Sequence, residues 1–378
     1  MSLLKHNISV IAILWAIIVF IQIIFPNSIG KPQFNGYYTG VFSIICFVIK
    51  PNIRIGLISL VSLVILLIFS EDILHPISDF TVIILTLTGF NIALSSKINN
   101  SERKFIGWAT AVFIALDVLG LAVPELYSDG NLRTRRYEGV LHSSNVSASV
   151  FSLCQIAFYE LKKGSKRKRI VLFSSFGLFV IMLLMTKTRS MLFFMPYWII
   201  QFYNKIDRKL FWCLLASIVI YTIKSILSIQ QDLRLEEEGS FITRKYLYET
   251  LINGIINQPF VPHGSSAANL LSKKLTNDDN FAAHNDLLLY VYDWGLIFFI
   301  LLVYIWNSYK RKIKFSWSNV TILLGWSSAC LHNVLLLSPV LFVFLLILNI
   351  EYNSQDRKHI KKREASKRKI GQSSYLRS

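Results

Sequence analysis

Five side chains that could act on a phosphate-bearing substrate lie beside apolar segments of this 378-residue chain. Three are arginines, Arg136, Arg189 and Arg244, and two are histidines, His142 and His284. The guanidinium group of arginine pairs bidentately with phosphate oxygens and stays charged at physiological pH. Imidazole exchanges a proton near neutral pH, so a histidine can take the proton of an attacking hydroxyl group. These residue types therefore predict a site for an anionic donor and a hydroxyl nucleophile.

Each of these residues also has a simpler structural interpretation. Arg136 and Arg189 can be interfacial cations that extend to lipid headgroups. Asn145 is suited to cap a helix, His284 stands at another predicted helix start, and Arg244 lies on an amphipathic surface. What favours a substrate site is that these residues fall on one predicted side of a membrane in a chain that is otherwise sparing with charge.

The composition requires that these residues be positioned by membrane-spanning helices. Hydrophobic residues make up 53% of the chain and charged residues 16%, with a mean hydropathy of +0.48. Soluble domains average about 45–50% apolar and 25% charged residues, which excludes an ordinary soluble enzyme and a disordered chain. The four cysteines lie inside apolar stretches without the spacing of a metal or redox motif, so we interpret them as small core residues.

About twelve apolar segments are candidate transmembrane helices, at roughly 20 residues per crossing. Lysine and arginine are concentrated in alternate loops, on the side of the membrane where the N-terminus and the C-terminal tail also lie. Basic loops are typically cytoplasmic, which predicts that both termini are cytoplasmic. The predicted spans are 8–25, 37–49, 55–70, 79–95, 105–123, 145–161, 170–186, 190–203, 210–228, 285–308, 316–333 and 338–350.

Two long outer segments are the places where a substrate site fits. The loop 124–144 and the large loop 229–284 between spans 9 and 10 are predicted to form it, because the cytoplasmic loops are short and basic. Within the large loop, residues 241–252 have the spacing of an interfacial helix, and the Pro- and Gly-containing stretch 257–264 stops that helix. We expect one polytopic domain over 1–350.

The remaining charges predict no nucleic-acid or metal site. The formal net charge is +18, but the cations lie in gaps between apolar runs, and the basic tail 351–378 is suited to anionic lipid. Asp278 and Asp279 lie among asparagines and are interpreted as a solvated turn, so we expect no metal.

The charged motifs, taken in order, resemble the bacterial O-antigen ligase and O-antigen polymerase superfamily over about residues 130–300. The turn at 186–190 reads Thr-Arg-Ser where the family has Ser-Arg, and the stretch ending at Gly264 reads Pro-His-Gly where the family has Gly-x-Gly. The resemblance rests on Arg136-Tyr137-Glu138-Gly139 followed by His142 to Asn145, on Thr186 to Ser190, on Arg244 before a stretch ending at Gly264, and on His284-Asn285 with Gly295 ten residues later.

This resemblance implies an all-α polytopic glycosyltransferase of the membrane C type, acting at the outer face of the bacterial cytoplasmic membrane. The donor and the acceptor would be undecaprenyl-pyrophosphate-linked glycans, with inversion at the anomeric carbon and without a cofactor or a metal. A flippase and a chain-length regulator are the implied partners. The implied roles are donor pyrophosphate binding for Arg189 and Arg244, general base for His284, and substrate binding for Arg136, His142, Asn145 and Asn285.

Three functions remain open at this point. A polymerase would join repeat units into a capsular, exopolysaccharide or O-antigen chain, whereas a ligase would hand the finished glycan to another acceptor. A transporter or flippase of lipid-linked glycans belongs to a different class and would use polar groups near the membrane midplane. The only clear acid in the middle of a predicted span is Asp117.

Overall fold

The computed structural model describes a helical protein. The described residues are 47–48, 51–95, 100–122, 144–162, 167–186, 188–203, 212, 216, 220, 238–276, 285–312, 317–330 and 347. Within them helix accounts for 89% of residues and no strand occurs, which confirms the all-α class. The number of membrane spans stays a prediction.

Apart from 190–203 and 285–308, each of which contains two elements, the predicted spans within the described residues begin and end close to observed helices. Asn52 caps α3, because its side chain accepts a hydrogen bond from the amide of Arg54 at 3.0 Å. The elements are α3 (Ile53–Phe69), α4 (Leu74–Ser95), α5 (Asn100–Ala122), α6 (Ser144–Lys162), α7 (Lys168–Thr186), η3 (Arg189–Phe194), α8 (Met195–Tyr203), α10 (Glu238–Asn257), α11 (Ala267–Thr276), α12 (Asp286–Trp294), α13 (Leu296–Lys312) and α14 (Trp317–Cys330).

One predicted span is broken in the structure. The segment 285–308 is not a single helix: α12 and α13 meet at an angle of 119°. The break lies at Gly295, which adopts a positive φ of 48°. A Cβ atom there would lie 2.8 Å from the carbonyl carbon of Val261, so the loop before α11 packs directly on this glycine. A tight backbone contact therefore turns the chain inside an apolar run.

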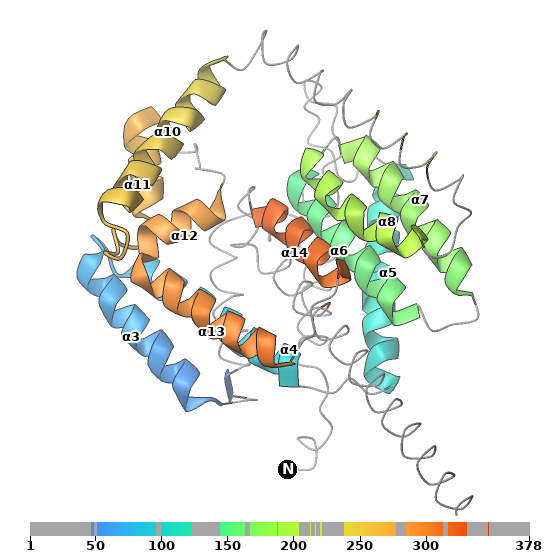
Figure 1. Ribbon diagram of the computed structural model, residues 1–378, viewed down its shortest axis with the longest axis horizontal. Helices are drawn as coiled ribbons and strands as arrows, with labels where there is room; N and C mark the ends of the chain where they lie inside the picture. Colours follow the sequence, from blue (N-terminus) through green and yellow to red (C-terminus); the bar gives the residue numbers. More distant parts are fainter. Residues whose placement is uncertain are drawn as a thin grey trace, which may run out of the picture.

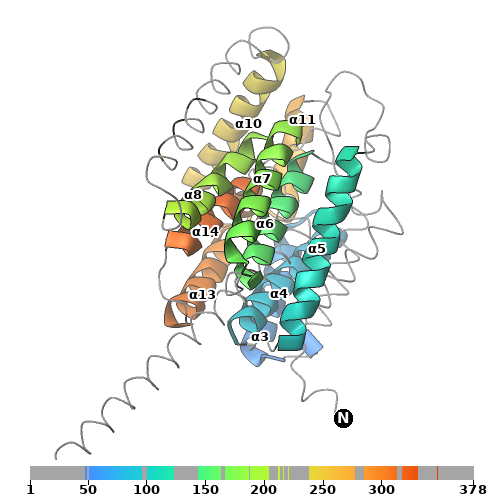
Figure 2. The same cartoon turned by 90° about the vertical axis from the view of Figure 1, so that its right-hand side faces the viewer.

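The described helices pack as two groups (Figure 1). The α3 bundle consists of α3, α4, α10, α11, α12 and α13, and the α6 bundle consists of α5, α6, α7, η3, α8 and α14. Between described helices, all substantial packing is within one group or the other. Figure 2 shows α5, α6 and α7 of the α6 bundle as a layer of roughly aligned helices.

Two apolar clusters hold the α3 bundle together. The larger one joins α3, α4, α12 and α13, and Leu66, Leu87 and Leu301 lie in it. The smaller one joins α10, α11 and α12 through Leu247, Leu251 and other aliphatic side chains. Helix α12 contributes residues to both clusters, so it links α10 and α11 to α3, α4 and α13.

The α6 bundle has an aromatic core. The indole of Trp198 lies within 6.5 Å, centroid to centroid, of several aromatic rings, among them those of Tyr159, Phe179 and Tyr197. Helix α6 is enclosed by its neighbours, although it carries polar side chains along its length. The buried polar side chains of α6 include Ser147, Ser149, Ser152, Gln155 and Glu160. Cys154 is buried and free, as expected of a core residue.

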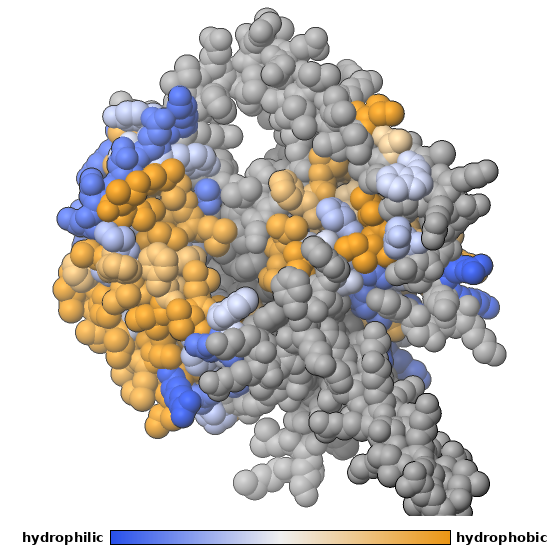
Figure 3. All heavy atoms as spheres, in the orientation of Figure 1, coloured by the Kyte–Doolittle hydropathy of each residue, from blue (hydrophilic) through white to orange (hydrophobic). Residues whose placement is uncertain are grey.

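The outward faces of several helices are apolar, whereas their inward faces carry hydroxyl groups. Helix α3 buries Ser59 and Ser62 and leaves Ile53 79% and Ile68 72% exposed. Soluble proteins show the opposite distribution. Exposed apolar side chains of α5, α7 and α13 include Phe105, Trp108, Val112, Ile170, Phe173, Ile181, Leu184, Leu302, Val303 and Trp306. Figure 3 shows the apolar surface of the α3 bundle as a broad area with hydrophilic residues above and below it.

By length and composition alone, one described helix is long and apolar enough to cross a membrane. It covers Arg169–Thr186, and the bent pair α12 and α13 would add a second span if it counted as one. Ile53–Phe69 and Met191–Tyr203 are apolar but shorter.

Candidate functional site

The structure describes the backbone, but not the side chains, of three predicted site residues. Arg189 begins η3, Arg244 lies in α10, and Asn145 lies in the first turn of α6. Arg136, His142 and His284 lie outside the described residues, as do Asp278 and Asp279.

Asn285 is the one predicted site residue with a described side chain, and it caps a helix. Its Oδ1 accepts a hydrogen bond from the amide of Leu288 at 3.1 Å at the start of α12. A capping side chain satisfies an amide that the helix leaves without a partner. Asn285 therefore has a structural role whether or not it also contacts substrate.

Arg189 follows a tight connection at the end of α7. The hydroxyl of Thr186 donates to the carbonyl of Met182 at 2.8 Å, and the amide of Thr188 donates to the hydroxyl of Thr186 at 3.4 Å. Both threonines are buried. These contacts end α7 and start η3 within three residues, so Arg189 is held at the boundary between two packed helices.

The helix that carries Arg244 confirms the prediction of a helix over 241–252 that stops at the stretch 257–264. The observed helix, α10, spans Glu238–Asn257. Leu247 and Leu251 are fully buried against α11 and α12. Lys245, beside Arg244, pairs with Glu249 at 3.9 Å on the exposed side. One face of the helix is thus packed, and the opposite face is open.

Arg189 and Arg244 belong to different bundles. Helix α10 packs on α11 and α12, whereas η3 packs on α6, α7, α8 and α14. The described contacts do not bring the two backbones together, and the loops that would complete a shared site lie outside the described residues. A common site for the two arginines remains a prediction.

The stretch after α10 is tightly fixed to the turn between α3 and α4. The amide of Ser265 donates to the hydroxyl of Ser70 at 2.8 Å. Gly264 has a φ of 101°, and a Cβ atom there would lie 2.3 Å from the carbonyl oxygen of Phe69. Only glycine fits such a position without rearrangement. The glycine that ends the Pro-His-Gly motif is therefore required by a contact between segments about 195 residues apart.

Two aspartates beneath this stretch were not identified from the sequence. Asp79 of α4 accepts a hydrogen bond from the indole N–H of Trp294 at 2.8 Å. Asp293 accepts one from the amide of Ala268 at 2.8 Å, at the start of α11. Each carboxylate joins elements distant in sequence, so the pair fixes α11 and α12 against α4.

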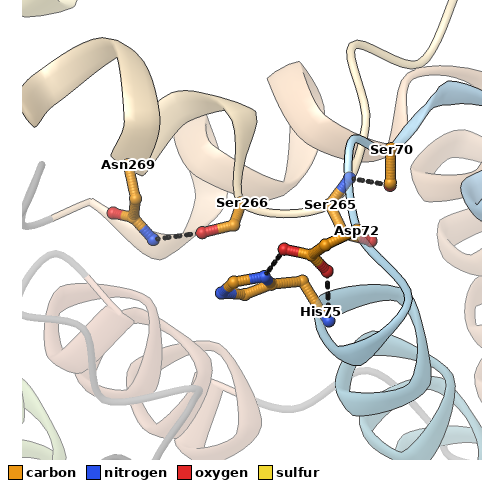
Figure 4. A network of polar contacts seen from close by, with 6 residues as sticks. All are labelled: Ser70, Asp72, His75, Ser265, Ser266 and Asn269. Atoms are coloured by element: carbon orange, nitrogen blue, oxygen red, sulfur yellow. Dashed lines mark hydrogen bonds and ion pairs between the residues drawn. The ribbon is translucent and has the colours of Figure 1, made fainter. Parts of the chain in front are cut away.

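Two histidines that the sequence reasoning did not select also lie here. His263 stacks on the ring of Tyr292, with centroids 3.9 Å apart, and its Nδ1 contacts the carbonyl oxygen of Tyr292 at 3.0 Å. His75, in the first turn of α4, pairs through its Nδ1 with Asp72 of the preceding turn (Figure 4). The three-residue spacing of Asp72 and His75 was the available signal, because an aspartate just before a helix accepts a hydrogen bond from an amide of the first turn.

Electrostatics in this turn favour a charged carboxylate. The backbone amide of His75 donates to Asp72 at 3.0 Å and lowers the pKa of that carboxyl below its usual value, and the His75 side chain acts in the same direction. Asp72 is therefore ionised at neutral pH and can only accept hydrogen bonds. Among the described residues, no group of three or more acidic, histidine or cysteine side chains is arranged to hold a metal ion.

Comparison of the chain with known protein families, with curated proteins and with solved structures finds no match.

Proposed function

We propose that this protein is a polytopic membrane glycosyltransferase that polymerises undecaprenyl-pyrophosphate-linked oligosaccharide repeat units at the outer face of the bacterial cytoplasmic membrane. The product is a capsular, exopolysaccharide or O-antigen chain. The proposal extends the confirmed all-α fold with the resemblance in the charged motifs.

The distribution of side chains over the helices supports a membrane location. In α3 the hydroxyl groups of Ser59 and Ser62 face inward and aliphatic side chains face outward. Helices in lipid pack through small and hydroxylated residues, because lipid chains already solvate large apolar side chains. The exposed apolar area in Figure 3 has the arrangement of a lipid-facing belt between two polar edges.

The observation that carries the enzymatic proposal is the place of the two arginines in the chain. Arg189 comes three residues after the end of α7, the described helix best suited to span a membrane. Arg244 lies in α10, which leads directly into the stretch that contacts the turn between α3 and α4. Arg189 thus follows a helix end that the charge distribution assigns to the outer side, and Arg244 lies in the large loop assigned to the same side.

The chemistry requires cations at that position. Attack of an acceptor hydroxyl on the anomeric carbon breaks the bond to the pyrophosphate, whose negative charge increases in the transition state. Preorganised guanidinium groups stabilise such charge, in a place where lipid lowers the dielectric constant. The hydroxyl proton needs an acceptor, the role predicted for His284.

The size of the polymer in a deletion strain tests the proposal. We expect loss of long chains with retention of single repeat units. Accumulation of long lipid-linked chains that never reach their carrier would instead identify a ligase. An unchanged polymer would exclude both enzymes.

Arginine variants test the site itself. Arg189→Ala, Arg244→Ala and His284→Ala should each abolish polymer without loss of membrane-inserted protein. The same-helix control Lys245→Ala should retain polymer, because Lys245 already pairs with Glu249 on the exposed surface. Lysine at position 189 or 244 should rescue poorly, since a point charge does not reproduce the paired hydrogen bonds of guanidinium.

A lipid-glycan transporter is the competing class. Asp117, the mid-span acid that it would use, is fully buried in α5, and it interacts electrostatically with Cys154 of α6. A carboxylate on a transport path would line a cavity that opens to both faces in turn. In this structure Asp117 lies between packed helices and is not exposed.

A further inference from the structure

The pair formed by Asp72 and His75 goes beyond what a helix cap requires. Asp72 caps α4 through the amide of His75, and that contact needs no particular side chain at position 75. The imidazole nevertheless folds back on the same carboxylate through Nδ1. Because an ionised carboxylate only accepts hydrogen bonds, Nδ1 carries the hydrogen, and in the neutral ring Nε2 is left with a lone pair.

The free nitrogen of this imidazole is open to a ligand. The side chains of His75 and Asp72 are 54% and 47% exposed. Contact with the carboxylate orients the ring, and among the described residues Nε2 makes no hydrogen bond. Imidazoles oriented in this way by a carboxylate accept hydrogen from hydroxyl groups in many enzymes.

The start of α11 brings further polar groups to the same place. The bond between Ser265 and Ser70 holds this segment against the turn that carries the pair. Ser266 adopts a positive φ of 64°, a conformation that serine seldom takes, and its hydroxyl accepts a hydrogen bond from Nδ2 of the Asn269 side chain at 3.5 Å. Figure 4 shows Ser266 and Asn269 in one close-up with the imidazole of His75.

The groups of this cluster match hydroxyl groups and not phosphate. Carboxylate, imidazole, hydroxyl and amide groups all exchange hydrogen bonds with hydroxyl groups, whereas phosphate recognition calls for arginine or lysine. The cluster of Asp72, His75, Ser266 and Asn269 contains neither cation, and a carboxylate repels phosphate. The site therefore complements, and does not repeat, the cationic one expected around Arg189 and Arg244.

We propose that Asp72, His75, Ser266 and Asn269 form a binding site for hydroxyl groups of a saccharide, with Nε2 of His75 accepting one of their hydrogens. Under the proposed function, on which this assignment rests, the saccharide is the acceptor end of the growing glycan. His75 is then a second imidazole beside the acceptor, distinct from His284.

Saturation-transfer NMR on the full chain in lipid nanodiscs tests the binding directly. The probe is the free oligosaccharide that mild acid releases from the lipid-linked repeat unit of the source cell. We expect binding to the unaltered protein and about tenfold weaker binding for His75→Ala, the effect of losing one good hydrogen bond. His75→Gln should recover part of the affinity, because an amide can replace Nε2 as a hydrogen-bonding group.

Matched variants separate binding from folding. Asp72→Asn keeps a residue that caps helices well but turns an N–H donor toward Nδ1 of His75. Nδ1 then accepts, the hydrogen lies on Nε2, and Nε2 can no longer accept from a saccharide hydroxyl, so this variant should weaken binding and leave the fold intact. Glu71→Ala removes the neighbouring exposed carboxylate, which is not in the cluster, and should bind as the unaltered protein does. Inorganic pyrophosphate should not displace the oligosaccharide.

The outcomes distinguish this proposal from the proposed function. No binding to the unaltered protein, equal binding to His75→Ala, or displacement by pyrophosphate would each overturn the saccharide site, even if the deletion strain loses its polymer. Binding that depends on His75 in a protein that makes no polymer would support the saccharide site and reject the polymerase. In an active protein, His75→Ala should raise KM for the acceptor with little change in kcat.

Discussion

The indole N–H of Trp294 donates a hydrogen bond to the carboxylate of Asp79 at 2.8 Å, and this contact joins α12 to α4 across 215 residues of sequence. Trp294 is the last residue of α12, directly before the bend at Gly295. The direction in which α12 leaves α13 is therefore fixed by a polar contact at the bend itself. Because Asn285 caps α12 at its other end, the same contact orients the helix that follows His284.

A double-mutant cycle measures this contact. Trp294→Phe removes the donor and leaves a part-buried carboxylate without it, so we expect a loss of about 1.5–3 kcal/mol in the free energy of unfolding. Asp79→Ala should cost a similar amount, and the double variant should cost less than the two together. Trp306→Phe, at an exposed position of α13, is the control and should stay within about 0.5 kcal/mol. Strict additivity would show that the two side chains do not stabilise each other.

Replacement of Gly264 by alanine should destabilise the fold strongly, although it adds only one methyl group. A φ of 101° is strained for alanine, and the added Cβ would overlap with the carbonyl oxygen of Phe69. We expect Gly264→Ala to lower the free energy of unfolding by more than about 2 kcal/mol in a denaturant titration. Gly177→Ala in α7 is the matched control, since nothing lies near its Cβ position, and it should be neutral or stabilising by up to about 1 kcal/mol. Similar losses at both glycines would contradict the described contact.

The sequence predicted the helices better than their breaks. The existence of α10 and its stop followed from the spacing of apolar residues over 241–252 and from the Pro- and Gly-containing stretch, although the helix extends beyond 241–252 at both ends. The bend at Gly295 was missed because the apolar run continues on both sides of a single glycine, and its cause is a contact with Val261 in a distant segment. Helix α11 was missed because it is short and polar.

The candidate site was also predictable only in part, because some of its residues have a local sequence signal and others are brought together by distant contacts. Arginines beside apolar segments are visible in the sequence, because they contrast with their surroundings. Asp72, His75 and Ser266 have ordinary neighbours, and they come together only when the turn after α3 meets the start of α11. The bond from Ser265 to Ser70 that brings the two segments together has no local sequence signal.

The charge of Asp72 should contribute to stability in a pH-dependent way. Its pKa in the folded protein is lowered from 3.8, first by the hydrogen bond from the amide of His75. A lowered pKa gives a stabilisation that is present above the unfolded value and is lost as the pH falls through the folded value. We expect the difference in Tm between the unaltered protein and Asp72→Asn to be constant at and above about pH 5 and to shrink below 3.8. A difference that persists unchanged at low pH would mean that charge is not its cause.

Labelling of single cysteines determines whether the helix ends lie on the predicted sides of the membrane. In a variant whose four native cysteines are replaced by alanine, Glu71→Cys and Lys273→Cys should react with an impermeant maleimide in intact cells, because both positions are exposed at the end of the α3 bundle that carries the Ser265 contact. Lys162→Cys and Arg167→Cys, at the facing ends of α6 and α7, should react only after the membrane is permeabilised. The expectation follows from the positive-inside rule, since residues 162–169 are the most basic connection between described helices. Labelling of all four positions from one side would contradict the predicted membrane topology. It would also contradict the proposed enzyme at the outer face, which depends on that topology.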